Sequence, residues 1–578
     1  MGQTTPLSRR EIASAAFVTL AATALYLAPF ARGLHRPGRE DWQQWTFFEA
    51  ATRKAVVEHG ELPLWNPYAC GGMPLHAHPF TRALAPLAPL HWLIDHPASL
   101  RLEAFLLVAG IALGAYLLGR RAGLSRAASA LAGVVAAFAG TTAGRLHSGH
   151  LGLLQVPPLL LAVYARRRAG PDGPAIALGA AGIAVAIFSG GNFLAAAAAI
   201  ALGFEALWDA AAKQSVRPLL RAAGIVALGF ALAAIKIIPV VDFMRDYPRA
   251  TTGHDPFARG GPLAALLRLP GAVVEAPFLW HEYAAYVGAL PILLALAGLA
   301  LAPRRAARPL ALVALLAVIA AGDFAPLAPW AWLHRLPIFG AMRIPARFLV
   351  LAVVPLGEAA GVGLDALAAR LPRAPARLAW LAAAAIFLDL GLAARPALGR
   401  AFVEPSPLFF LDGVPLDGAF RQVRGSPNLM AQAAERNLGT LRCADGVPIR
   451  RSERLRGATQ RGYRGEVWLM GEGSVHVARW SPSSLSVDVD VQAPRGATLV
   501  VNQNFDHRWR ADTPHAPRDF EGLLAVPLPP GARRVTLSYR PASVAWGAAA
   551  SALALVFALA LARRRGHTTQ ARSGRSAS

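Results

Sequence analysis

Long apolar runs separated by short arginine clusters constrain this chain more than any other feature. Only 16% of its 578 residues are charged and its mean hydropathy is +0.40, whereas about a quarter of the residues in a soluble domain are charged. Twelve runs reach or approach the length of a membrane span, namely 11–31, 101–119, 127–144, 150–165, 174–191, 193–208, 220–241, 285–302, 309–321, 346–367, 378–394 and 543–562. We therefore predict an all-α polytopic membrane domain of about twelve transmembrane helices.

The basic residues predict the orientation of these spans. Clusters occur at every second connection, at Arg9 and Arg10, Arg120, Arg121 and Arg126, Arg166–Arg168, Lys213, Arg217 and Arg221, Arg304, Arg305 and Arg308, Arg370, Arg373 and Arg377, and Arg563–Arg565. With twelve spans all these clusters lie on one side, which the positive-inside rule makes cytoplasmic. Both termini are then cytoplasmic, in a plasma (inner) membrane. Because the net charge of +24 comes largely from such clusters, we expect no nucleic-acid partner.

The outer side then receives residues 32–100, 242–284, 322–345 and 395–542. The last of these segments contains alternating runs, Ser484–Val491, Ala497–Asn502 and Arg534–Tyr539, with Pro- and Gly-rich turns between them. Period-two alternation with such turns is typical of antiparallel strands. We expect three parts: a transmembrane domain at 1–394, an extracytoplasmic β-sandwich or jelly-roll-like domain at 395–542, and a last helix with a basic tail at 543–578.

The first outer loop, 32–100, has the most unusual composition. Trp42 and Trp45 lie at helical spacing, which predicts a helix from Asp41 to about His59. Such a helix would lie at the outer membrane interface, with its tryptophans at headgroup level. The two cysteines of the chain, Cys70 and Cys443, both fall outside, where a disulfide can form, although two cysteines in a long chain can also stay unpaired.

A set of segments, in order, gives a family resemblance. EDWQQW and GELPLWNPYACGGMP lie in the first outer loop. They are followed by GHLGLLQVPPLLL (149–161), IKIIPVVDF (235–243), EYAAYVGALPILLALAGL (282–299), LPIFGAMRIPARFLVL (336–351) and NQNFDHRWRAD before the last span. Together they resemble the bacterial YfhO-like membrane proteins of the GT-C glycosyltransferase superfamily. The resemblance implies transfer of a sugar from a polyprenyl-phosphate donor to an extracytoplasmic glycan or lipid, with a catalytic acid residue in the first outer loop.

Asp41 is the first catalytic candidate. An inverting transfer needs a carboxylate that takes the proton of the attacking acceptor, and Asp41 follows the first span at the level of a lipid phosphate. The alternative is that Asp41 caps its helix, with Gln44 as capping-box partner. Glu40 is a weaker candidate, as a supporting group or a metal ligand. A divalent cation stays open as a cofactor, although EDW lacks the spacing of a DxD site.

Arg343 and Arg347 flank Pro345 at the outer end of the tenth predicted span. Fixed cations there would stabilise the charge of a departing lipid phosphate, or they would simply snorkel to the interface. Together with Asp41 they are predicted to line one cavity from opposite walls.

The remaining substrate-binding candidates are Lys236, Glu282, Tyr286, His147, His150, His76 and Asn66. Lys236 lies inside an apolar run, where a cation indicates function by default, unless it pairs with Asp242 or snorkels. The i, i+3 pair His147 and His150 could bind a metal but has no local third ligand, so a polar turn lining the cavity is favoured. Glu282 beside aromatics suits a sugar hydroxyl, or belongs to an interfacial aromatic belt.

Two other classes of function stay open. A transporter or flippase of a polar lipid would be expected to show repeated halves with broken helices, and the sequence shows no clear repeat. A membrane-anchored envelope assembly factor would dock through the β-domain and would not need Asp41.

Overall fold

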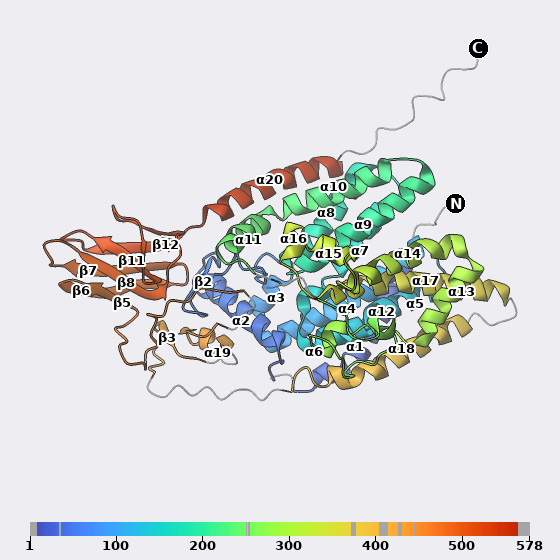
Figure 1. The fold of residues 1–578 in the computed structure, drawn as a ribbon, viewed down its shortest axis with the longest axis horizontal. Coiled ribbons are helices and arrows are strands. Elements are labelled where there is room, and N and C mark those ends of the chain that lie inside the picture. Colours follow the sequence, from blue (N-terminus) through green and yellow to red (C-terminus); the bar gives the residue numbers. More distant parts are fainter. Residues whose placement is uncertain are drawn as a thin grey trace, which may run out of the picture.

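The computed structural model describes residues 8–33, 36–249, 251, 255–371, 377–403, 414–425, 430–443 and 447–563. Figure 1 shows an elongated molecule with a β-sandwich at one end and a helical bundle at the other. Helix α20 (Ala542–Arg563) leaves the sandwich and runs along the bundle. The first outer loop lies between the two parts, where the label of strand β2 (Met73–Pro74) marks it.

Each of the twelve predicted spans coincides with helix. In order, they correspond to α1 (Arg9–Tyr26) with η1 (Ala28–Ala31), α4 (His96–Arg121), α5 (Arg126–Phe138) with α6 (Gly140–Ser148), η3 (Leu151–Leu154) with α7 (Pro157–Arg167), α8 (Asp172–Phe188), α9 (Asn192–Lys213), α10 (Arg217–Leu232) with α11 (Ala234–Asp246), α13 (Ala289–Leu301), α14 (Pro303–Ala320), η5 (Pro345–Phe348) with α17 (Leu349–Arg370), α18 (Arg377–Leu398) and α20. The other, shorter helices are α2 (Asp41–Arg53), η2 (Lys54–Glu58), α3 (Ala88–Leu93), α12 (Gly261–Ala265), η4 (Trp280–Tyr283), α15 (Pro329–Leu333), α16 (Pro337–Gly340) and α19 (Met430–Glu435).

Not all of these helices are long enough to cross a bilayer. Among the described residues, six helical segments have the length and apolarity of a span: His96–Arg121, Arg126–Ser148, Asn192–Lys213, Pro345–Arg370, Arg377–Leu398 and Ala542–Arg563. The pair α10 and α11, bent by 71°, makes a seventh if it is one span. The count of twelve is not reproduced, because α8 has 17 residues and α13 has 13. At 1.5 Å per residue they reach about 26 and 20 Å, less than the ~30 Å of a hydrocarbon core.

The arginine clusters meet at one end of the bundle. The joining contacts are Arg120 with Glu11 (2.8 Å), Arg121 with the carbonyl oxygen of Arg167 (3.3 Å), Arg221 with that of Arg168 (2.6 Å) and Arg305 with that of Gly123 (3.1 Å). Clusters from five separate connections therefore share one end, as their alternation along the chain predicts.

The predicted sandwich is present. Its two four-stranded sheets have the orders β10-β11-β8-β5 and β6-β7-β12-β9, and all paired neighbours are antiparallel. The strands are β5 (Val467–Met470), β6 (Gly473–Ser481), β7 (Ser484–Val491), β8 (Ala497–Asn504), β9 (Trp509–Ala511), β10 (Arg518–Phe520), β11 (Leu523–Leu528) and β12 (Arg534–Tyr539). Alternate residues such as Val487 and Leu537 face inward and are fully buried. A short parallel pair, β3 (Arg421–Val423) and β4 (Leu438–Thr440), precedes the sandwich.

The first outer loop is threaded into this sandwich. Strand β1 (Trp65–Asn66) pairs with β2, and Trp65 lies in the sandwich core, 4.9 Å from the Tyr539 ring between centroids. Its indole Nε1 donates to Gln503 Oε1 at 2.8 Å. Cys70 and Cys443 form a disulfide, the bonded alternative of the two left open by the sequence, with Cα atoms 4.5 Å apart. The loop is therefore fixed by both the β-domain and the segment that precedes it.

The tryptophans of helix α2 are buried inside the protein. Trp42 and Trp45 are 0% and 5% exposed, and their indole nitrogens donate to the carbonyl oxygens of Leu146 at 2.9 Å and Gly149 at 2.7 Å. The predicted apolar stripe exists, but it packs on protein rather than on lipid. The predicted capping box is also wrong, because Glu40 is the N-cap residue and no side chain caps this helix.

Candidate functional site

The site is built around Glu282, which is buried in η4. Helix α6 packs tightly against η4: a Cβ on Gly144 would lie 2.8 Å from the main-chain oxygen of His281. This approach brings Arg145, only 1% exposed, to Glu282. The guanidinium of Arg145 donates to the Glu282 carboxylate and, at 2.8 Å, to its main-chain oxygen.

A second arginine reaches the same carboxylate from a strained turn. Ile344 has a φ of 65°, a left-handed conformation that a β-branched residue rarely adopts. The turn η5 follows, and Arg347 Nε donates to Glu282 Oε2 at 3.0 Å. Arg343 takes a different direction, with its guanidinium 5.8 Å from the centre of the Phe278 ring. The two predicted phosphate-binding arginines therefore diverge, and only Arg347 joins the cluster.

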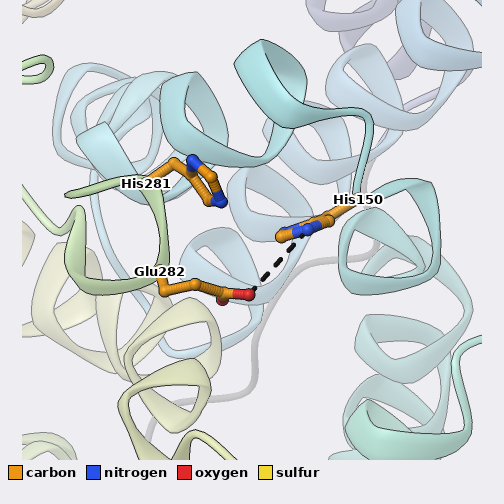
Figure 2. A group of neighbouring side chains, drawn as sticks. All are labelled: His150, His281 and Glu282. Carbon is orange, nitrogen blue, oxygen red and sulfur yellow. Dashed lines mark ion pairs between the residues drawn. The ribbon is translucent and has the colours of Figure 1, made fainter. Parts of the chain in front are cut away.

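Two histidines complete the cluster, and Figure 2 shows the imidazoles of His150 and His281 beside Glu282. His150 Nε2 lies 3.3 Å from Asp41 Oδ2 and 3.8 Å from Glu282 Oε1. His150 Nδ1 lies 3.0 Å from a guanidinium nitrogen of Arg145. Because a guanidinium can only donate, Nδ1 must accept. Neutral His150 thus carries its proton on Nε2 and presents it to Asp41.

The protonation states of the cluster follow from burial and charge. Burial lowers the pKa of His150 well below its usual range, against the opposing effect of Glu282, and lowers the pKa of His281 to about 4. Burial alone would raise the pKa of Glu282, but the attraction of Arg347 and Arg145 outweighs it and holds that pKa well below the usual range. Two arginines therefore face the buried Glu282 carboxylate, next to Asp41.

Asp41 borders a cavity on its other side. Its side chain is 48% exposed, and it lines a cavity of about 180 Å³ together with Gln44, Met73 and the disulfide of Cys70 and Cys443. Neither predicted arginine lines this cavity, so this cavity does not join them to Asp41. Arg347 is linked to Asp41 through Glu282 and His150.

Glu40 precedes Asp41 in a strained conformation. Its φ is 52°, in a region that non-glycine residues seldom occupy, and such strain concentrates at functional sites. Burial raises the pKa of the Glu40 carboxyl, with Arg39 opposing and Glu282 adding to the shift. Glu40 Oε2 lies 3.7 Å from His281 Nδ1, so both predicted acidic residues touch the cluster.

The donor atoms of a metal site are present, but their partners do not suit a cation. One ligand atom each of His150, His281 and Glu282 lies within 4.8 Å of the others. Both carboxylate oxygens of Glu282, however, accept from Arg347, and one also accepts from Arg145. A divalent ion at this point would be repelled by two guanidiniums and would need the nitrogen of His150 that carries the proton. We therefore assign no metal to this site.

Main-chain contacts hold Lys236 of α11 and the two remaining candidates from the first loop, His76 and Asn66. Lys236 is buried and donates to the carbonyl oxygens of His76 and His78, both at 2.8 Å. It therefore fixes the loop, while Asp242, its predicted partner, pairs with Arg508. His76 Nε2 donates to the Ile235 oxygen at 2.9 Å. The buried amide oxygen of Asn66 accepts from the nitrogen of Tyr68 at 3.0 Å.

Two further candidates make their hydrogen bonds outside the cluster, although the His147 ring lies 6.4 Å from the His281 ring. The phenol of Tyr286 donates to Asp389 Oδ1 at 3.0 Å, and His147 Nδ1 donates to the main-chain oxygen of Ala397 at 2.8 Å. The predicted histidine pair is thus divided, because the sharp turn at Gly149, with a φ of 80°, sends His150 alone into the cluster.

Sequence reasoning missed Arg145 and His281. Arg145 lies in RLHSGH, close to the candidates His147 and His150, and His281 precedes the candidate Glu282 in HEY. The available signal for Arg145 was its position as a basic residue at the end of an apolar run. It also missed a buried network in which Arg82 pairs with Glu49 at 2.8 Å and also with Glu103. This network lies under Trp45, whose ring centre is 4.4 Å from the Arg82 guanidinium. This chain matches no protein-family model and no curated protein.

Proposed function

We propose that this chain is a GT-C-type membrane glycosyltransferase that moves a sugar from a polyprenyl-phosphate carrier to a hydroxyl of an extracytoplasmic glycan or lipid. The observation that carries the proposal is the position of Asp41. Its half-exposed carboxylate borders a cavity and touches a cluster that contains two arginines. A base next to cations is what an inverting displacement of a phosphate requires.

In this mechanism the acceptor oxygen attacks the anomeric carbon while Asp41 takes its proton. The bond between that carbon and the phosphate oxygen breaks, and polyprenyl phosphate leaves with the bonding electrons. Arg347, whose side chain is 22% exposed, is the cation of the cluster that an incoming phosphate can reach. Arg145 is buried and acts by holding Glu282 and His150. The proton on His150 Nε2 would orient the Asp41 carboxylate.

The proposed setting is the plasma (inner) membrane. The arginine-rich end of the bundle would face the cytoplasm, with both termini on that side, and the sandwich and Asp41 would lie outside. The meeting of five arginine clusters at one end supports this orientation.

The test is Asp41→Asn in the full chain, reconstituted in liposomes with polyprenyl-phosphate hexoses and a cell-envelope extract as acceptor. Asparagine keeps the shape but not the basicity, so the release of polyprenyl phosphate should fall by roughly 10³-fold. Asp389→Asn, at a carboxylate that pairs with Tyr286, is the matched control and should keep wild-type turnover. Unchanged turnover in Asp41→Asn would instead favour a non-catalytic docking role.

A further inference from the structure

A groove lies where α11, α20 and the loop after β8 meet. Its volume is about 490 Å³. One wall is apolar, formed by Ile237 and Val241 of α11 and by Trp546 of α20, and the rim carries Arg245, His507 and Arg510. None of these residues contributes to the cluster around Glu282.

The break between α10 and α11 sets the position of this groove. The Ser551 hydroxyl of α20 accepts from the nitrogen of Ile235 at 2.9 Å and donates to the oxygen of Leu232 at 2.8 Å. A Cβ on Gly547 would lie 2.7 Å from the oxygen of Ala234, so α20 packs directly on the break. Main-chain groups freed by the 71° bend are thus satisfied inside the protein. The bend is therefore a built feature that turns α11 away from the direction of α10.

The groove lies at the end of a membrane span. Helix α20 is a candidate span, and it begins at Ala542, directly after the last sandwich strand ends at Tyr539. Trp546, in the first turns of α20, is 71% exposed. Exposed tryptophans at span ends lie among lipid headgroups. The rim is therefore at headgroup level, and the apolar wall extends toward the hydrocarbon core.

The charged side chains that line the groove are Asp242, Arg245, Arg508 and Arg510. Arg508 is buried and bound by the carboxylates of Asp242, Asp246 and Asp506 at 2.9, 2.7 and 3.0 Å. This arginine fixes the loop to α11, and each of its side-chain nitrogens donates to one of these carboxylates, so Asp242 is paired and the other two charged groups of the lining are cationic. Arg245 and Arg510 remain exposed. Arg510 donates from one nitrogen to the main-chain oxygens of His507 and Trp509, which holds its guanidinium at the rim.

We propose that this groove binds an anionic glycerophospholipid of the outer leaflet. Arg245 and Arg510 would hold the phosphate by charge-assisted hydrogen bonds, and the acyl chains would lie along Ile237, Val241 and Trp546. The bound lipid would join the sandwich to the bundle at the break. This site does not depend on glycosyl transfer, because it shares no residue with Asp41 or its cluster.

The experiment is a titration of the purified full chain with phosphatidylglycerol, followed by native mass spectrometry in detergent. The double variant Arg245→Gln, Arg510→Gln should bind the first lipid roughly 10-fold more weakly, with an unchanged melting temperature. The control variant Arg479→Gln, Arg495→Gln changes two exposed arginines elsewhere on the sandwich and should bind as the wild type does.

Two further measurements address the nature of the ligand. Phosphatidylcholine should bind the wild-type chain more weakly than phosphatidylglycerol, and Trp546→Ala should weaken phosphatidylglycerol binding. Equal binding of phosphatidylglycerol by the wild type and the Arg245, Arg510 variant would overturn the proposal. So would inorganic phosphate at millimolar concentration displacing the lipid completely, since it would show that the apolar wall contributes nothing.

Discussion

Replacing Trp65 by alanine is expected to destabilise the β-sandwich severely, although Trp65 lies far from it in the sequence. The side chain is 1% exposed and packs against Trp509 and Tyr539 with ring centres 5.5 and 4.9 Å away. Truncation of a buried tryptophan costs about 3–5 kcal/mol. The loss of its hydrogen bond to Gln503 adds about 1 kcal/mol. We therefore expect a loss of about 4–6 kcal/mol in the free energy of unfolding of the sandwich.

For a unit of this size, each kcal/mol lowers the melting temperature by about 4–8 °C, so Trp65→Ala should lower it by roughly 20 °C or more. The assay is thermal proteolysis of the full chain in detergent, with cleavage followed between β5 and β12. Trp380→Ala, at a tryptophan that is 48% exposed, is the control and should change the midpoint little. If both variants melt alike, Trp65 is not part of the sandwich core and the threading of the first loop is wrong.

Three more predictions concern the disulfide, the buried carboxyl of Glu466 and the buried amine of Lys236. The double variant Cys70→Ser, Cys443→Ser opens a loop of 373 residues and should lower the free energy of unfolding by about 3–5 kcal/mol. Its thermal midpoint should equal that of the wild-type chain in reductant. A wild-type midpoint that does not change with reductant would contradict this prediction. Burial raises the pKa of Glu466 to about 7 from 4.5. The protonated carboxyl therefore contributes its full stability below pH 4.5, and about 3 kcal/mol of the free energy of unfolding is lost as the pH rises through 7. Glu466→Gln should make the thermal midpoint less dependent on pH between pH 5 and 8, and a pH dependence equal to that of the wild type would refute this. Lys236→Met leaves buried carbonyl oxygens without a donor, so hydrogen exchange should accelerate in the turn at 76–78 but not in β7.

Three strands of the sandwich, β7, β8 and β12, were accessible from the sequence because their period is local. Ser484–Val491 alternates without interruption and forms β7 with those bounds. The stripe of Trp42 and Trp45 was also found correctly, but periodicity does not say whether an apolar face meets lipid or protein. Only the carbonyl groups of the turn at 146–149, which accept from both indoles, determine that.

The candidate site was accessible only in part. The sequence placed Asp41 and Arg347 at the predicted outer ends of two spans, and therefore at the same depth. In the structure both contact the cluster around Glu282 and His150. Arg343 was grouped with Arg347 because both flank Pro345, and this grouping fails because Ile344 adopts a left-handed conformation. Arg145 meets Glu282 because Gly144 lets α6 approach η4. A close approach between distant segments leaves no periodic signal.

Because Trp65 packs in the core of the sandwich, it can be buried only after the ribosome has made the much later sandwich strands. At 5–20 residues per second, the ribosome needs roughly 25–95 seconds after Trp65 before it completes β12. During that time Trp65 has no sandwich core to pack into, and its uncovered side chain is a potential binding site for a chaperone. Cys70 is likewise synthesised long before its disulfide partner Cys443. Because the chain contains only two cysteines, no wrong intramolecular disulfide can form before Cys443 is made.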